Sequence, residues 1–350
     1  MNSRERVLAA VAHAAPDRVP LDWNGEPQVS AGLRARLGLR THEELLRYLG
    51  VDIRHVGLAF RSGRAPRSTL PDGGWEDIWG VRHRPNELHS GYVYYHPLAE
   101  LASEADLDAY AWPDPDALDY DAYPAALDAA GDYFRIGGWG NRILWTGIEL
   151  VGMERFLFML IEQPELVHTL LGRITDYYYE VATRCYPRVR GKLDAVSHGS
   201  DFGTQLDLII SLPMWREFCR PYFERMFRLA REHGFLVYLH SDGAIRRAIP
   251  DLIAMGLDIL NPIQVGAAGM DPAGLKRDFG DRLSFHGGID VQRTLPFGSP
   301  DDVRAEVRQR IAELGRGGGY ILSCSHSLLP DVPQANILAM YDEAAQAGRY

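Results

Sequence analysis

Hydrophobic and polar positions follow two alternating periods through most of this chain. From about residue 130 onward, short runs rich in β-branched and aromatic residues are each followed by a longer stretch with apolar residues at helical spacing. This alternation is typical of repeated βα units, whose strands lie parallel in one sheet. The predicted strands are Tyr133–Gly137, Asp194–His198, Phe235–His240, Asp258–Asn261, Leu283–His286 and Tyr320–Ser323. The predicted helices are Gln163–Tyr186, Met214–His233, Ile245–Met255, Pro272–Phe279, Pro300–Leu314 and Pro333–Ala347.

Two earlier strands and two earlier helices complete the pattern. The strands are predicted at Val19–Trp23 and Asp52–Val56. Helices are predicted over Ser3–His13 and Thr41–Leu49, because each begins with a capping-box pattern that places Glu three residues after a side-chain acceptor. Eight strands with intervening helices fit a (β/α)8 barrel better than an open doubly wound sheet.

Residues 60–131 interrupt this rhythm. Trp79–His83 and Tyr92–His96 predict a β-hairpin, and Trp112–Tyr123, rich in Pro, Asp and Tyr, predicts irregular surface chain. A length of 350 residues allows either two domains or one barrel with additional chain. We interpret 60–131 as an insertion into one barrel loop, so that residues 1–350 form a single α/β domain.

Composition and motifs argue against several classes of function. The chain carries 37 basic and 47 acidic residues, a net charge of −10, which is the opposite of what a nucleic-acid backbone selects. No apolar run approaches the ~18 residues of a membrane span, so neither nucleic acid nor membrane is an expected partner and a cytoplasmic location is expected. No nucleotide-binding glycine motif follows a strand, and Gly317–Gly319 precedes one. Three scattered cysteines, Cys185, Cys219 and Cys324, indicate a reducing compartment rather than a disulfide framework.

Polar and aromatic residues follow the predicted strands at their carboxyl ends. In a (β/α)8 barrel these ends converge on one mouth, so a binding site is expected there. The residues are Asp22, Trp23, Asn24, His55, Trp139, Asn141, Asp201, Gln205, His240, Asp242, Asn261, Gln264, His286, Asp290 and His326.

The sharpest local pattern at these strand ends is His240-Ser241-Asp242-Gly243. Because alternate side chains of an extended chain point to the same face, His240 and Asp242 can reach one metal ion together, with a third ligand from another strand. Each also has a structural interpretation. His240 could be a hydrogen-bonded histidine that ends a core strand, and Asp242 could be the N-cap of the following helix.

Other residues near the mouth have structural interpretations as well. Asp201 could be a turn residue, His55 a hydrogen-bonded packing residue, and Trp139 a pocket wall or a packing residue. Cys324 is the only cysteine near the mouth. Its parity along the strand Tyr320–Ser323 leaves open whether it points inward.

Short motifs spread over nearly the whole chain carry a family resemblance. They are Ser3-Arg-Glu-Arg-Val, Asp17-Arg-Val-Pro, His240-Ser-Asp-Gly, Asp258-Ile-Leu-Asn-Pro, Leu275-Lys-Arg-Asp-Phe-Gly, Phe285-His-Gly-Gly-Ile-Asp, Leu295-Pro-Phe-Gly, Gly317-Gly-Gly-Tyr-Ile-Leu and Asp331-Val-Pro. Together they resemble the uroporphyrinogen decarboxylase superfamily. The resemblance implies a (β/α)8 barrel, in agreement with the strand count.

The superfamily contains two chemistries, and the first is disfavoured for this chain. True uroporphyrinogen decarboxylases act without metal and carry, after the first strand, a segment whose arginines hold the substrate carboxylates. The corresponding segment here starts at Pro20 and has no arginine before Arg34. A substrate with many carboxylates would therefore lack its clamps.

The second branch consists of zinc-dependent methyltransferases that exchange methyl groups with a corrinoid protein. These enzymes use a His-x-Cys pair after the fifth strand and a cysteine after the eighth. The matching positions here hold His240, Asp242 and His326, which the resemblance implies as ligands of zinc, with iron as the alternative. Two imidazoles and a carboxylate leave the ion more positive than thiolates do. This favours an oxygen-based group, such as the ether of a methoxylated aromatic compound.

The resemblance also implies roles for the neighbouring residues and partners. The predicted catalytic residues are Asp201, His286 and Asp290. The residues predicted to bind substrate are Trp23, Asn24, Trp139, Gln205, Tyr238 and Gln264. The expected partners are a small methylated substrate and a separate protein that carries a cobalamin-type corrinoid. A homodimer is one assembly that this interpretation leaves open.

Two other functions remain open at this stage. One is a metal-independent decarboxylase acting on uroporphyrinogen or an aromatic acid. The other is a non-catalytic subunit that binds a corrinoid protein. Carbon dioxide release would support the decarboxylase, whereas His240→Ala should abolish a metal-dependent activity and leave the binding role of a non-catalytic subunit untouched.

Overall fold

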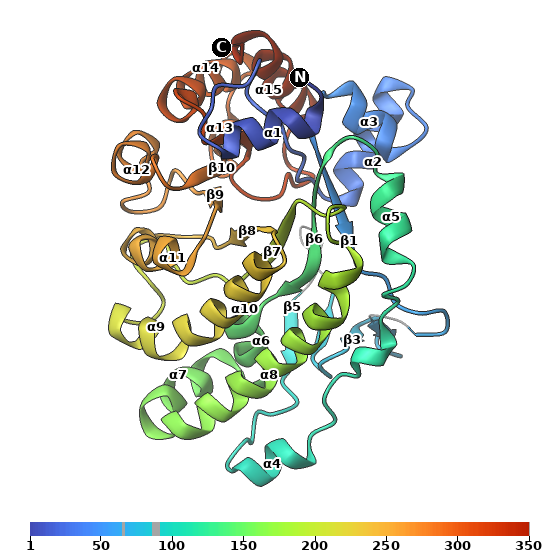
Figure 1. The fold of residues 1–350 in the computed structure, drawn as a ribbon, viewed down its shortest axis with the longest axis vertical. Coiled ribbons are helices and arrows are strands. Elements are labelled where there is room, and N and C mark those ends of the chain that lie inside the picture. Colours follow the sequence, from blue (N-terminus) through green and yellow to red (C-terminus); the bar gives the residue numbers. More distant parts are fainter. Residues whose placement is uncertain (65–66, 86–91, 350) are drawn as a thin grey trace.

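Seven parallel strands form one curled sheet, the main scaffold of the protein (Figure 1). The computed structural model describes residues 1–64, 67–85 and 92–349, apart from the side chain of Trp139. The strands lie in the order β1–β6–β7–β8–β9–β10–β11, so each strand pairs with the next one along the chain. Their bounds are Ile53–Gly57 (β1), Phe134–Asn141 (β6), Ala195–Gly199 (β7), Leu236–His240 (β8), Ile259–Ile263 (β9), Ser284–Ile289 (β10) and Tyr320–Cys324 (β11).

Residues 20–22 join the two edges of the curled sheet. The N–H of Leu322 in β11 donates to the carbonyl of Pro20, the N–H of Asp22 donates back to Leu322, and the N–H of Asp52 donates to Leu21. The predicted strand Val19–Trp23 is therefore only a short bridge, since Pro20 has no N–H for a ladder bond. The eight-strand prediction is confirmed for seven strands, and the sheet is consistent with a TIM-barrel-like fold.

Helices surround the sheet (Figure 1): most cover its outer face, whereas α1 packs against the apolar part of its inner face. They are α1 (Ser3–Val11), α2 (Pro27–Leu37), α3 (His42–Tyr48), α6 (Ile143–Val151), α7 (Met153–Glu162), α8 (Pro164–Cys185), α9 (Leu212–Phe218), α10 (Arg220–Glu232), α11 (Ile249–Met255), α12 (Pro272–Phe279), α13 (Thr294–Phe297), α14 (Pro300–Arg310) and α15 (Gln334–Ala347). Among the described residues, no helix is both long and apolar enough to cross a membrane.

Some helices differ from the sequence-based prediction. The helix predicted at Met214–His233 is divided into α9 and α10, because Pro221 cannot continue the hydrogen-bond ladder of the preceding turn. Helices α2, α6 and α7 were not predicted. Helix α6 is apolar nearly all round, with buried residues on most of its surface, so it lacks the polar stripe that reveals an amphipathic helix.

The inner face of the curled sheet changes from apolar to polar along the strands. Its apolar part packs against Val7 of α1, and its members are Ile53, Phe134, Ile136, Ala195, Tyr238, Ile259 and Ile321. Alternate residues of a strand share a face, so the next inward positions on β1, β7, β8 and β9 are His55, Ser197, His240 and Asn261. These polar residues line a cavity at the carboxyl ends of the strands.

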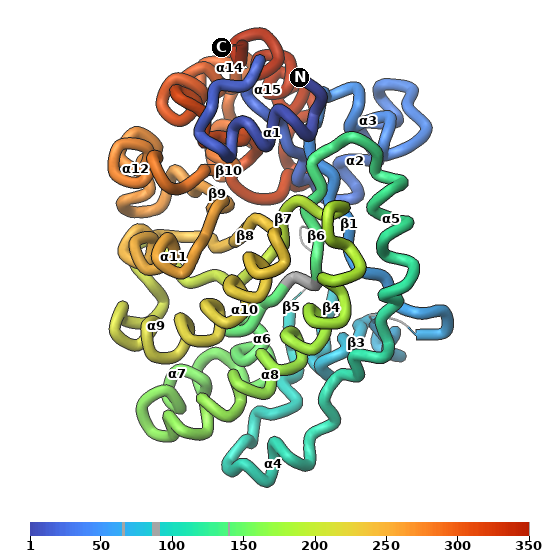
Figure 2. The backbone as a smooth tube through the Cα atoms, viewed as in Figure 1, coloured from blue at the N-terminus to red at the C-terminus, as the bar shows by residue number. Residues whose placement is uncertain are grey.

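The insertion predicted at 60–131 carries a small sheet of its own. Strands β2 (Arg67–Thr69), β3 (Trp75–Asp77), β4 (Arg82–Arg84) and β5 (Tyr92–Tyr95) pair antiparallel in sequence order. The predicted hairpin is present as β4 and β5, although β4 begins at Arg82 rather than Trp79. The insertion continues through α4 (Glu104–Ala109) and α5 (Tyr123–Ala129). Figure 2 shows α4 at the end of the molecule opposite the two chain termini.

The buried carboxylate of Asp52 ties α1 to the chain that bridges the sheet edges. It accepts hydrogen bonds from Arg6 at 2.7 Å, from both terminal nitrogens of Arg18 at 2.7 and 2.9 Å, and from the N–H of Leu21 at 2.9 Å. The Asp52 side chain is fully buried. Two guanidinium groups thus share this carboxylate, and Arg6 is also paired with Asp17 at 2.6 Å.

We predict that Asp52→Asn lowers the free energy of unfolding by about 3–5 kcal/mol, because it leaves the guanidinium group of Arg18 without its counter-charge and leaves Arg6 with Asp17 alone. Urea unfolding followed by circular dichroism measures the change. Asp301→Asn is the matched control, since the Asp301 side chain is 92% exposed and its pairing with Arg304 is screened by water. Equal stability of Asp52→Asn and wild type would contradict the prediction.

Candidate functional site

Three side chains with metal-ligand chemistry meet at the carboxyl ends of β8 and β11. His240, Asp242 and His326 each offer one ligand atom, and these atoms lie within 4.8 Å of one another. The Asp242 Oδ2 atom is 3.6 Å from His240 Nε2 and 3.3 Å from His326 Nε2. The pair from one strand end and the third group from another are thus brought together, as the sequence predicted.

The turn after β8 is shaped by close backbone packing. Gly243 has φ +87°, and a Cβ there would lie 2.5 Å from the backbone of Gly203, so only glycine fits. The N–H of Asp242 donates to Asp201 Oδ1 at 3.0 Å, and the N–H of Gly243 donates to Gln264 Oε1 at 2.7 Å. Asp201 and Gln264 therefore hold the turn that presents Asp242.

Asp242 is not the N-cap of the following helix, which was the alternative interpretation. The next helical turn, a 3-10 turn, begins at Arg246, with Ile245 in its N-cap position. The carboxylate of Asp242 instead faces the two imidazoles of His240 and His326. This orientation leaves its oxygens available to a cation.

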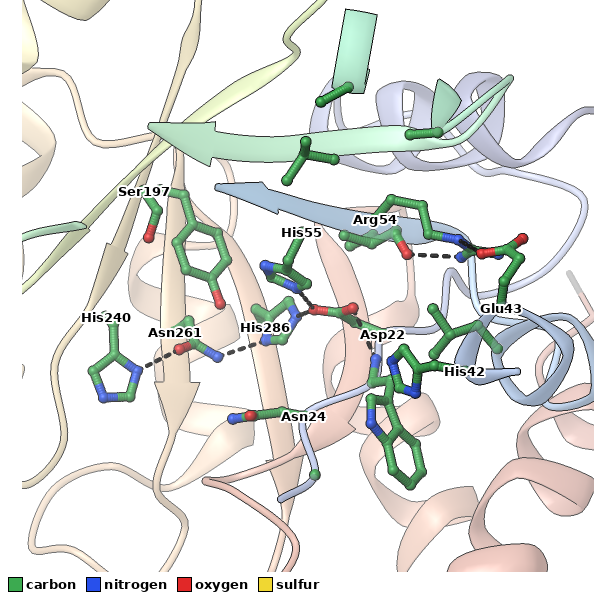
Figure 3. Close-up of a pocket in the computed structure, with 18 of the residues that line it drawn as sticks. Asp22, Asn24, His42, Glu43, Arg54, His55, Ser197, His240, Asn261 and His286 are labelled. Carbon is green, nitrogen blue, oxygen red and sulfur yellow. Dashed lines mark hydrogen bonds and ion pairs between the residues drawn. The ribbon is translucent and has the colours of Figure 1, made fainter. Parts of the chain in front are cut away.

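A chain of hydrogen bonds leads from His240 across the mouth (Figure 3). His240 Nδ1 lies 2.7 Å from Asn261 Oδ1, and Asn261 Nδ2 lies 2.6 Å from His286 Nδ1. His286 Nε2 lies 2.9 Å from Asp22 Oδ2, and His55 Nε2 lies 2.8 Å from the same oxygen. In Figure 3 the dashed lines from the rings of His55 and His286 meet at the carboxylate of Asp22. The two imidazoles therefore share one carboxylate oxygen.

The carboxylate of Asp22 is electrostatically dominated by its two histidines. Burial alone would raise the pKa of Asp22, but the charge of His55 and the hydrogen bonds from His286 and His55 hold it well below its usual range. For His55, the surrounding atoms lower the pKa by desolvation, and the charge of Asp22 with its hydrogen bond raises it by more, so the net pKa is raised. About half of the His55 side chain, 49%, still faces the cavity.

The pKa of His240 is also raised overall. Burial lowers it, whereas the nearby carboxylates of Asp242 and Asp201 and the hydrogen bond to Asn261 raise it by more. Asp201 Oδ1 lies 3.7 Å from His240 Nε2. The site therefore has an excess of negative charge that a bound cation would balance.

Three cavities adjoin the triad. The largest, of about 780 Å³, includes Trp23, Asn24, Tyr238, His240 and His286 in its lining. A second, of about 320 Å³, is lined by residues that include Gln205, Asp242, Gln264 and His326. A third, of about 240 Å³, is lined by Arg142, Trp145, Gly199, Ser200, Asp201, His240 and His326. Of the residues predicted to bind substrate, Trp23, Asn24 and Tyr238 line the first cavity and Gln205 and Gln264 line the second.

The remaining predicted residues occupy different positions. The carboxylate of Asp290 accepts from the N–H of Gln292 at 2.7 Å and lines none of these three cavities. Both ring nitrogens of His286 are hydrogen-bonded, so its predicted acid–base role stays a prediction. Cys324 is buried, its Sγ donates to the carbonyl of Asn24, and burial raises the pKa of its thiol to about 12. The side chain of Trp139 lies outside the part of the chain that the structure describes.

Sequence reasoning missed Arg142 and Trp145, which line the smallest cavity. They stand at the start of α6, directly after β6, where residues commonly reach a barrel mouth. The sequence does not reveal this helix, because α6 is apolar on nearly every side and has no amphipathic periodicity. In addition, the predicted strand ends at Gly137, whereas β6 extends to Asn141.

Comparison with known proteins identifies the family. The pattern of the uroporphyrinogen decarboxylase (URO-D) family matches residues 144–347, more than half of the chain, and the chain belongs to this family. It is thus an enzyme of the URO-D superfamily. The uroporphyrinogen decarboxylase of Alkalilimnicola ehrlichii is 28% identical over 286 residues, which cover 76% of this chain and 71% of that protein. The same enzyme of Methylococcus capsulatus is 26% identical over 298 residues, covering 83% and 74%.

A solved structure also resembles the whole chain. The methyltransferase from Methanosarcina mazei superposes with a TM-score of 0.70 over 99% of both chains, at 18% sequence identity. At this identity the likeness establishes the fold. It supports the TIM-barrel-like interpretation of the curled sheet.

We predict that Asp22→Asn lowers the pKa of His55 below its ordinary value, because the neutral amide removes the charge that outweighs desolvation. In the wild type the raised pKa contributes stability that is fully present below about pH 6.5 and lost as pH rises through the folded pKa. Nuclear magnetic resonance titration of the His55 Hε1 proton measures the shift. His42, in the wall of the same cavity, is the internal control, because its pKa is lowered by burial and by Arg34 and Arg54. An unchanged His55 titration would refute this electrostatic account.

Proposed function

We propose that this protein is a zinc-dependent methyltransferase that moves a methyl group between a small O-methylated substrate and the corrinoid of a partner protein. The observation that carries the proposal is the triad of His240, Asp242 and His326 at the junction of three cavities. The donor set suits zinc, because two imidazoles and one carboxylate are common zinc ligands and three protein ligands leave an open position for substrate. Two histidines and one carboxylate also bind iron(II), which is the alternative metal.

When bound, zinc supplies Lewis acidity toward the ether oxygen of the methyl donor. The protein residues supply positioning and protons. Trp23 and Tyr238 offer aromatic walls in the large cavity, and Asp201 faces the small cavity beside His240. In the proposed transfer the methyl C–O bond would break, and the methyl group would pass to the Co(I) corrinoid of the partner, which would supply the electron pair of the new bond. The oxygen keeps the electron pair and takes a proton from the neighbouring acid groups or solvent.

A decarboxylase is the second candidate, and the names of the relatives at 28% and 26% identity favour it. The lining of the large cavity argues against a polycarboxylate substrate. Among the described residues that line it, the one arginine is Arg54, which is 6% exposed and already bonded to Glu43 and to the carbonyls of Val51 and Ile53. Asp22 and Glu43 in the same wall would repel substrate carboxylates.

We predict that the purified protein binds zinc in a single site that requires the triad. Replacing His240, Asp242 or His326 singly with alanine removes one of three ligands and should weaken zinc binding by at least about tenfold, since even groups that only orient a ligand contribute this much. Metal analysis and isothermal titration with Zn(II) measure the effect. Asp290→Asn is the control, because Asp290 lines none of the three cavities. Zinc binding that survives all three alanine variants would exclude the triad as the site.

Methyl transfer gives the second test. We predict that the zinc-loaded protein methylates cob(I)alamin from methoxylated benzoates, that a strong chelator abolishes the reaction, and that His326→Ala lowers its rate at least about a hundredfold, since a ligand contributes more than the groups that orient it. The absorbance change of the corrinoid measures turnover. Carbon dioxide release from uroporphyrinogen without metal would overturn the proposal in favour of the decarboxylase. Tight binding to a corrinoid protein that His240→Ala leaves unchanged, without turnover, would favour a non-catalytic subunit.

A further inference from the structure

The imidazole of His240 can bind a metal through Nε2 only if the proton of its neutral ring sits on Nδ1. Asn261 supplies the group that receives this proton. Its Oδ1 atom, which only accepts, lies 2.7 Å from His240 Nδ1. The two residues are direct partners in the β8–β9 ladder, so the backbone itself sets this contact.

The orientation of the Asn261 amide is fixed from its other side. Its Nδ2 group, which only donates, lies 2.6 Å from His286 Nδ1 and therefore needs a lone pair there. His286 has that lone pair when its proton is on Nε2, where it is donated to Asp22 at 2.9 Å. Because the carboxylate of Asp22 is ionised and only accepts, it dictates the position of every proton up to His240.

The reversed arrangement is unfavourable. A flipped Asn261 amide would donate to His240 Nδ1 and move the ring proton to Nε2, where it blocks metal binding. The neutral ring of His286 would then carry its proton on Nδ1, and its Nε2 lone pair would face the Asp22 carboxylate at 2.9 Å without a proton between them. In so buried a position, an unpaired polar group is costly. Asp22, Asn261 and His286 are 1%, 4% and 1% exposed.

Asp22 is itself held on several sides. Its second carboxylate oxygen accepts from the N–H of Trp23 at 2.8 Å, and its backbone carbonyl accepts from the hydroxyl of Tyr341 at 2.7 Å. His55 donates to the same oxygen that His286 contacts. Asp22, the last member of the hydrogen-bond chain that starts at His240, is therefore held in place by Trp23 and by Tyr341 of α15.

We propose that Asp22 and Asn261 are positioning residues that, through His286, hold His240 in the one tautomer that presents Nε2 to the metal. This inference rests on the proposed function, because it requires that His240 binds a metal ion. Asp22 would thereby influence the metal affinity of His240 through three successive hydrogen bonds. Neither positioning residue touches the metal.

The experiment measures Zn(II) affinity of the metal-free protein by competition with a chromophoric chelator. Asn261→Leu keeps the side-chain size but removes both hydrogen bonds, and it should weaken Zn(II) binding about 10–100-fold. Asn261→Asp keeps the acceptor for His240 Nδ1, and it should bind Zn(II) at least about tenfold more tightly than Asn261→Leu does. Asp22→Asn, whose amide no longer dictates the proton on His286, should weaken binding by an intermediate factor.

A spectroscopic signature separates positioning from mere stability. The ¹⁵N shifts of His240 in the metal-free full-length protein report which ring nitrogen carries the proton. They should indicate Nδ1–H in the wild type and a mixture in Asn261→Leu and Asp22→Asn. The tautomer is measured without metal, so it tests this inference even if the wild type fails to bind Zn(II), an outcome that would overturn the proposed function alone.

The chain offers a matched control in a second buried asparagine–histidine pair. Asn141 Nδ2 lies 2.9 Å from Nδ1 of His198, a fully buried ring whose pKa is lowered by burial to about 3. Asn141→Leu should lower stability but leave Zn(II) affinity and the His240 shifts unchanged. Two results would overturn the inference: unchanged His240 shifts with wild-type Zn(II) affinity in Asn261→Leu, or an equal loss of affinity in Asn141→Leu.

Discussion

The ionised carboxylate of Asp22 is the interaction on which the order of the barrel mouth depends. It is almost fully buried, and it stays charged because two imidazoles donate to the same oxygen. A buried charge of this kind is costly unless it is paired and hydrogen-bonded, and here both conditions are met. Because each hydrogen bond needs one donor and one acceptor, this fixed acceptor sets the donor and acceptor roles of His286, Asn261 and His240.

The mouth and the barrel interior share one periodic design. The same inward-facing positions that bury Ile53, Ala195, Tyr238 and Ile259 carry polar groups two residues later. The apolar layer excludes water beneath the polar layer, so hydrogen bonds there act in a medium of low dielectric constant. Catalytic and structural needs are thereby met by the same strands, and the ends of β8 and β9 contribute adjacent members of one network.

Sequence patterns predicted most of the fold and part of the site. The strands were predictable because each is a short apolar run beside an amphipathic helix, and His240 with Asp242 followed from their spacing within one strand end. His326 could be assigned only through resemblance, since it lies on a different strand end. The contact of His286 with Asp22 joins residues 264 positions apart, and it depends on the curl and register of the whole sheet, which no local pattern encodes. Likewise, α6 escaped prediction because it is apolar on nearly every side.

The bridge formed by residues 20–22 has a consequence for biosynthesis. This segment leaves the ribosome long before one of its two neighbours in the sheet, β11, which begins at Tyr320. Pairing across that interval requires a long loop to close before any contact rewards it, which is slow in folding. During translation the early strands must therefore wait with an unpaired edge that exposes backbone donors and acceptors. Strand β11 closes the sheet against residues 20–22, so a chain stalled before Tyr320 would lack both this closure and the candidate ligand His326.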